Sequence, residues 1–165
     1  MNSRHIFGLG AVACTVLSLL AAVPASAQTL KDQLIGTWSM ESNIEEYADG
    51  KKVSWDPSLK GMVMYDAGGR FILMATEVGN RKKVEGNPAL NPVGRLIGYF
   101  GTYTVDEADK TITHKIVGAS SPIWDSTDQK RVVTAITASS MIFKAAAPIP
   151  SAQGPFVPVV TWKKN

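Results

Sequence analysis

The sequence predicts an all-β protein that folds as an antiparallel, up-and-down β-barrel with a short helical segment near residues 91–98. Two observations predict this fold class. Apolar and polar residues alternate over short runs, which is the periodicity of half-buried strands, and turn signals such as Asp49-Gly50 separate these runs. The chain has 165 residues, of which 45% are hydrophobic and 19% charged. These values fit a folded domain and exclude a disordered chain.

The expected elements follow one another along the chain, beginning with a helical turn in residues 28–34. Clear hairpins surround the turns at 66–69 and 106–109, and a third hairpin turns through 138–140. A loop at 77–98 and a proline-rich loop at 148–158 interrupt the series, because proline is unsuited to central strand pairing. The expected strands are 37–44, 62–65, 71–75, 99–105, 111–117, 131–137, 141–145 and 159–162. Short consecutive turns favour closure into a barrel, which covers the apolar face of the sheet.

Residues 1–27 have the three zones of a secretory signal peptide. Arg4 is positive, residues 6–23 are apolar, and Ala25-Ser26-Ala27 supplies the small residues of a cleavage site. We therefore expect cleavage after Ala27, export to the periplasm or the medium, and a barrel domain of residues 28–165. A membrane anchor is the competing interpretation, but the small-residue site argues against stable membrane insertion. Lipidation at Cys14 is a minor alternative.

Composition and motifs exclude several classes of function. The net charge is only +3. The basic run Arg81-Lys82-Lys83 lacks interleaved aromatic residues, so no nucleic-acid partner is expected. The sequence has no phosphate-binding loop, serine elbow or paired-histidine motif. We therefore expect no cofactor and no metal site.

The candidate site lies on the inner face of the expected barrel. Strand alternation turns His114 inward, and it is the single histidine of residues 28–165. Tyr99 and Tyr103 share a face of the preceding strand and should lie near His114, with Gly101 between them opening space. A lone inward histidine is more often a hydrogen-bonded core residue than a catalyst. The candidate ligand-binding residues are Tyr65, Tyr99, Tyr103, His114 and Trp124.

An ordered set of motifs runs along the chain. Gly36-Thr37-Trp38 opens the first strand. The later motifs are Gly61-Met62-Val63-Met64-Tyr65, Gly68-Gly69-Arg70-Phe71, Tyr99-Phe100-Gly101-Thr102-Tyr103-Thr104-Val105, His114, Pro122-Ile123-Trp124, Arg131 and Thr161-Trp162. Together they resemble the bacterial lipocalin-like domain family over nearly all of residues 34–164. The resemblance implies an antiparallel calyx in which Trp38 packs across the closed end, with Arg131 as a candidate for the basic side chain that covers it through a cation–π contact.

Two hypotheses of function follow from different classes. The first is an exported barrel that binds a small, mostly apolar or aromatic molecule, because an apolar cavity with a few polar anchors is typical of such sites. The second is a cofactor-independent lyase, isomerase or cyclase in the same cavity. There His114 would be the acid/base, Tyr99 or Tyr103 would donate a proton, and Arg131 would hold a carboxylate. A barrel with a filled core remains a third possibility, and the oligomeric state stays open.

Overall fold

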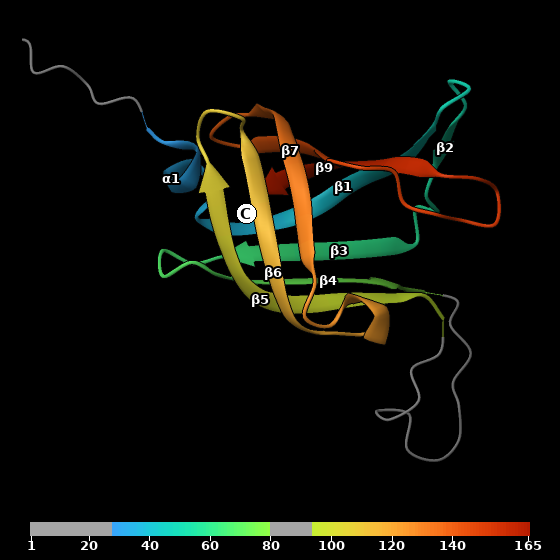
Figure 1. The fold of residues 1–165 in the computed structure, drawn as a ribbon, viewed down its shortest axis with the longest axis horizontal. Coiled ribbons are helices and arrows are strands. Elements are labelled where there is room, and N and C mark those ends of the chain that lie inside the picture. Colours follow the sequence, from blue (N-terminus) through green and yellow to red (C-terminus); the bar gives the residue numbers. More distant parts are fainter. Residues whose placement is uncertain (1–27, 80–93) are drawn as a thin grey trace, which may run out of the picture.

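The computed structural model describes residues 28–79 and 94–165, which form an almost entirely β structure (Figure 1). Among these described residues, one short helix, α1, covers Leu30–Leu34, and one 3-10 turn covers Pro122–Trp124. The strands are β1 (Gly36–Tyr47), β2 (Lys52–Ser54), β3 (Leu59–Tyr65), β4 (Arg70–Glu77), β5 (Leu96–Asp106), β6 (Thr111–Ala119), β7 (Asp128–Ile136), β8 (Ser140–Ala145) and β9 (Phe156–Lys164).

The barrel closes through its longest strand, β1. Eight strands, β1 and β3–β9, follow in sequence order, and β1 also pairs with β9. The start of β1 pairs with β3, whereas its longer remainder pairs with β9 and, near its end, with the short strand β2. All of these pairings are antiparallel. The predicted all-β, up-and-down barrel is therefore confirmed.

Strand alternation decides which side chains enter the core, even where both faces of a strand are apolar. On β3, Val63 is fully buried, while Met62 and Met64 are 44% and 47% exposed on the outer face. On β4, Phe71 is buried while its neighbour Ile72 is exposed. Because the side-chain period is two residues, the register fixes these choices for a whole strand at once.

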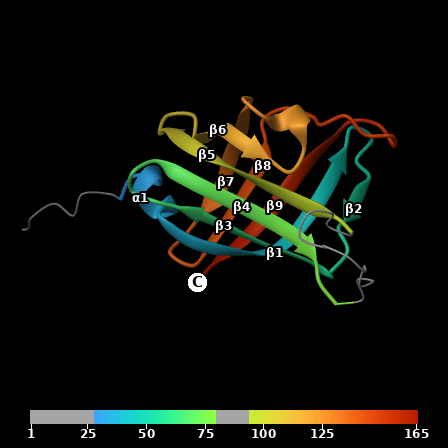
Figure 2. The same cartoon turned by 90° about the horizontal axis from the view of Figure 1, so that it is seen from below.

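Helix α1 covers one end of the barrel, and β2 lies at the opposite end (Figure 2). The Thr29 hydroxyl accepts a hydrogen bond from Asp32 N, which caps the first turn. Leu30 and Leu34 are buried, and the Leu34 carbonyl accepts a hydrogen bond of 2.8 Å from the indole Nε1 of Trp38. Trp38 thus packs across the closed end, which is the position that the family resemblance implies.

The cation above Trp38 is Lys164 and not Arg131, so that part of the prediction is wrong. Lys164 Nζ lies 4.8 Å from the centre of the Trp38 ring and donates a hydrogen bond of 3.0 Å to the Gln33 carbonyl. The cause is register, because Trp38 on β1 pairs directly with Lys164 on β9. Arg131 lies on β7, which does not pair with β1.

Two loop boundaries also differ from the prediction. Of the helical segment expected near residues 91–98, residues 91–93 lie outside the described chain, and Leu96–Gly98 already belong to β5. Pro158 lies inside β9 and not in a loop, and pairs with Glu45 of β1. Strand β9 pairs with β8 only from Val159 onward. Pro158 therefore has no partner residue on β8, and its missing N–H removes no hydrogen bond between these two strands.

Gly101 has a different role from the one its sequence position suggests. It lies at a bulge where the register of β5 and β6 shifts between Phe100 and Gly101. A Cβ atom on Gly101 would overlap with the backbone carbonyl of Lys115 and approach Val117 N to 3.0 Å. The glycine therefore allows two backbones to approach closely and does not open space in the barrel.

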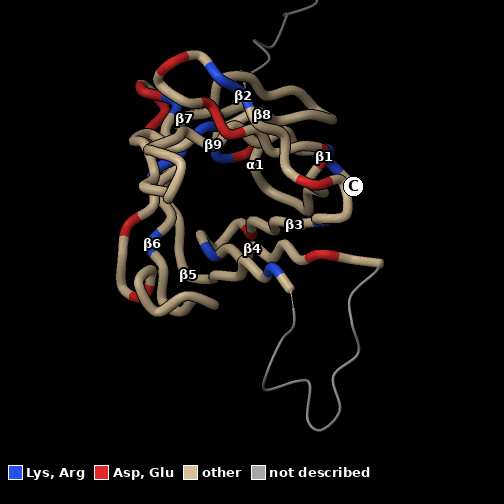
Figure 3. The backbone as a smooth tube through the Cα atoms, turned by 90° about the vertical axis from the view of Figure 1, so that its right-hand side faces the viewer, with Lys and Arg blue, Asp and Glu red and all other residues tan. Residues whose placement is uncertain are grey.

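Charged residues of both signs are distributed over the strands and loops (Figure 3). The ion pairs of the described residues join exposed or half-exposed side chains, such as Lys52 with Glu46 and Lys115 with Asp128. Such pairs contribute about 0–1 kcal/mol each. The barrel is therefore stabilised mainly by packing of its core.

The proposed signal peptide, residues 1–27, lies outside the described part of the chain. Within the described residues, no helix has the length and apolar character needed to cross a membrane.

Candidate binding cavity

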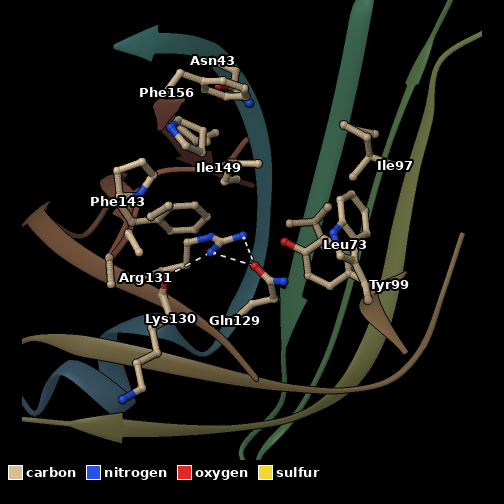
Figure 4. Close-up of a pocket in the computed structure, with 18 of the residues that line it drawn as sticks. Asn43, Leu73, Ile97, Tyr99, Gln129, Lys130, Arg131, Phe143, Ile149 and Phe156 are labelled. Atoms are coloured by element: carbon tan, nitrogen blue, oxygen red, sulfur yellow. Dashed lines mark hydrogen bonds between the residues drawn. The ribbon is translucent and has the colours of Figure 1, made fainter. Parts of the chain in front are cut away.

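A cavity of about 750 Å³ opens into the barrel interior. Its walls come from β1, β4, β5 and β7–β9, and its outer part from the 3-10 turn and residues 146–150. The inward apolar residues of these strands include Leu73, Ile97, Tyr99, Phe143, Val160 and Trp162, several of which are drawn in Figure 4. Trp55, Trp124 and Phe156 add further aromatic surface. A cavity of this size and lining is typical of sites for small organic molecules.

Arg131 is the buried charged residue among those that β7 contributes to the cavity lining, whereas Asp128 and Lys130 are exposed (Figure 4). Its side chain is only 8% exposed. Nη1 donates to the Lys130 carbonyl at 3.0 Å, and both terminal nitrogens lie 3.4 Å from Oε1 of Gln129. Arg131 therefore faces the cavity while being held by neutral acceptors from its own strand.

Two further polar atoms of the cavity lining are buried without a hydrogen-bond partner among the described residues. They are Oδ1 of Asn43 on β1 and Nε1 of Trp162 on β9. Both atoms are covered by the surrounding protein, so they are exceptions to the rule that buried polar groups have a hydrogen-bond partner.

His114 lies in a layer of packed aromatic rings and does not line the cavity. It is fully buried, and a hydrogen bond of 2.8 Å joins its Nε2 to the hydroxyl of Tyr65. The Phe71 ring lies 4.3 Å from the imidazole, and the Tyr99 ring lies 6.3 Å from it (both between centroids). Because Tyr99 also lines the cavity, His114 sits behind the cavity wall.

Burial determines the protonation of this layer. Loss of hydration lowers the pKa of His114 well below its usual range, and the positive charge of Arg131 lowers it further. Burial likewise raises the pKa of Tyr65 well above its usual range. Both groups are thus neutral near pH 7. A histidine that stays neutral and does not line the cavity does not support the acid/base role assigned to it by the enzyme hypothesis.

The structure separates the five candidate ligand-binding residues into two groups. Tyr99 and Trp124 line the cavity, and their rings lie 5.8 Å apart. Tyr65, Tyr103 and His114 face inward but pack in the filled part of the barrel, where the Tyr103 hydroxyl donates to the Asp66 carbonyl at 2.8 Å. The lining residues that the sequence interpretation missed include Asn43, Leu73, Phe143 and Trp162. The alternation of residues in 141–145 and 159–162 could have indicated that Phe143 and Trp162 face inward.

The buried histidine leads to a testable dependence of stability on pH. An unfolded chain has a histidine pKa of about 6.5, so below that pH it binds a proton that the folded protein does not. The free energy of unfolding should therefore fall as the pH drops below about 6.5, with His114 contributing about 2 kcal/mol of loss by pH 5. Urea denaturation at pH 7 and pH 5 measures this loss, and a His114→Gln variant should lack the histidine contribution. Equal losses in the two proteins would contradict the neutral, buried histidine.

Comparisons with known proteins give one match to a protein family. The model of a family described as a lipocalin-like domain matches residues 35–165. No curated protein matches the chain. Among solved structures, the chain is similar to a redesigned β-barrel at 15% identity and a TM-score of 0.42, over 86% of this chain and 99% of that one. It is also similar to an uncharacterized protein from Bacteroides eggerthii at 16% identity and a TM-score of 0.43, over 80% of this chain and 99% of that one.

Proposed function

Since the chain belongs to the lipocalin-like domain family, we propose that it binds a small, mostly apolar or aromatic molecule inside the barrel. The observation that carries this proposal is the cavity of about 750 Å³ with its largely apolar and aromatic lining. Transfer of apolar surface from water into such a space stabilises a complex by roughly 25 cal/mol per Å². Aromatic walls formed by Tyr99, Trp124 and Phe143 favour a flat or ring-containing ligand.

The proposal includes where binding takes place. The zones of residues 1–27 support export with cleavage after Ala27, so the ligand would be met in the periplasm or the medium. Mass determination of the protein recovered from its native host tests this step directly. A mature chain that begins at Gln28 is expected, and an intact N-terminus would contradict it.

Binding can be measured with phenylnaphthylamine, an uncharged aromatic compound whose fluorescence rises when it leaves water. We expect saturable binding by the wild-type protein. An Ala145→Phe variant should weaken it by about tenfold or more, because Ala145 lines the cavity and a phenyl ring there would occupy space that the probe needs. A control substitution of the same kind, Ala138→Phe, lies at the exposed turn between β7 and β8 and should leave the affinity unchanged.

Comparing the two variants also distinguishes binding in the cavity from binding on the outside of the barrel, where apolar side chains such as Met74 and Phe100 are about half exposed. Binding at those outer residues would not respond to Ala145→Phe. Failure of the wild-type protein to bind phenylnaphthylamine or any other apolar probe, or equal binding by the two alanine variants, would contradict the proposed site.

A further inference from the structure

Arg131 differs from the charged residues of the surface because it is buried without an opposite charge. The ion pairs of the described chain join exposed residues, and none of them includes Arg131. No described carboxylate oxygen lies within 4.0 Å of its guanidinium nitrogens. The side chain nevertheless retains only 8% of its accessible surface.

The neutral partners of Arg131 leave much of its donor capacity unused. A guanidinium carries five N–H donors and keeps its charge at any physiological pH. Here the Gln129 amide oxygen receives two long contacts of 3.4 Å, and the Lys130 carbonyl receives one of 3.0 Å. Nε of Arg131 donates to no described residue. The group is therefore positioned by its own strand and remains open toward the cavity (Figure 4).

A buried cation in apolar surroundings is unfavourable unless something in the site pairs with it. A carboxylate or sulfonate supplies what is missing, because its two or three oxygens match the fork of guanidinium donors. Most of the remaining walls, which include Leu73, Tyr99 and Phe143, are apolar or aromatic, and the charged side chains of Asp128 and Lys130 in the lining are exposed.

We infer that the ligand of this cavity is an amphipathic organic anion, whose carboxylate or sulfonate pairs with Arg131 while its apolar body lies against the walls formed by Leu73, Tyr99 and Phe143. This inference rests on the proposed binding function and names the chemical class of the ligand. It assigns Arg131 to ligand recognition. The positive charge selects anions over uncharged molecules of the same shape, because only an anion compensates the buried guanidinium.

Two probes with one aromatic skeleton test this assignment. Anilinonaphthalene sulfonate carries an anionic group that phenylnaphthylamine lacks, and both compounds become fluorescent in apolar surroundings. In an Arg131→Met variant, the affinity for the sulfonate should fall by about 10- to 100-fold, the range expected for loss of a hydrogen bond to a charged group. The affinity for phenylnaphthylamine should change by less than about threefold, because methionine keeps the wall apolar.

Control variants separate recognition from general charge effects. Lys163→Met removes an exposed cation of β9 and should leave both affinities unchanged. Arg131→Lys keeps the charge but loses the planar fork, so its affinity for the sulfonate should lie between those of the wild type and Arg131→Met. The melting temperature of Arg131→Met without ligand should equal or exceed that of the wild type, because an uncompensated buried charge has been removed. A lowered melting temperature together with unchanged sulfonate binding would assign Arg131 to structure.

The wild-type protein alone provides a second measurement that needs no variant. Decanoate should displace phenylnaphthylamine at a concentration at least about tenfold lower than methyl decanoate, which has the same chain but no charge. Equal displacement by the two compounds, or equal sulfonate binding by wild type and Arg131→Met while phenylnaphthylamine still binds, would overturn the inference and leave the binding function intact. If neither probe binds in a manner that depends on Ala145, the binding function itself fails.

Discussion

Replacing Trp38 with alanine is expected to lower the free energy of unfolding by about 3–5 kcal/mol, the usual range for removing a large aromatic side chain from a core. Trp38 is fully buried, and its indole Nε1 donates to the Leu34 carbonyl at 2.8 Å. The variant loses the ring that joins α1 to the barrel and leaves that carbonyl without its partner. Urea denaturation followed by far-UV circular dichroism measures the change.

Two other substitutions define what Trp38 contributes. Trp55→Ala removes a partly exposed indole from the other end of the barrel, where Nε1 donates to Glu45 at 2.8 Å, and should cost about 1–2 kcal/mol. Lys164→Met removes only the cation over the Trp38 ring and its hydrogen bond to Gln33, which should cost about 1 kcal/mol. If Trp38→Ala destabilises the protein no more than Trp55→Ala does, the closed end is not the stabilising element described above.

The parts of the fold that could be predicted from the sequence are those that local physics determines. The turn at 66–69 contains Asp and Gly and the turn at 106–109 contains two Asp residues, which are typical turn residues, and the structure places hairpins β3–β4 and β5–β6 around them. Alternation also assigned the correct face to His114, Tyr99 and Tyr103, all of which are buried. Local pattern is sufficient for these features because a hairpin and a strand face depend on neighbouring residues only.

The depth of a residue along the barrel could not be predicted in this way. Alternation predicts that Tyr99 and Tyr103 both point inward, but not that Tyr99 lines the cavity while Tyr103 packs in the filled part of the barrel. That distinction depends on the stagger of eight strands and on which layer of the interior is filled. The sequence interpretation also placed Arg131 above Trp38, where the structure has Lys164. The reason is the same, because the position of Lys164 follows from the long-range register of β1 and β9.

Replacing Gly101 with alanine is expected to destabilise the barrel by about 3 kcal/mol or more, although it adds only one methyl group. The new Cβ would overlap with the Lys115 carbonyl, which is backbone and cannot rotate away. To relieve this overlap, β6 must move away from β5 at the bulge. The paired residues Tyr103 and His114 lie on the same two strands. The substitution should therefore loosen the layer that holds His114 against Tyr65.

Gly98→Ala is the matched control, because it makes the same chemical change in the same strand. The nearest atom to a Cβ on Gly98 is the Leu73 carbonyl oxygen at 3.9 Å, an ordinary contact, so this variant should remain within about 1 kcal/mol of the wild type. Urea denaturation of both variants gives the comparison, and a loss of native circular dichroism in Gly101→Ala alone is the extreme form of the expected result. Equal stabilities would mean that β6 yields without loss, and that close backbone approach is not the reason for glycine at this bulge.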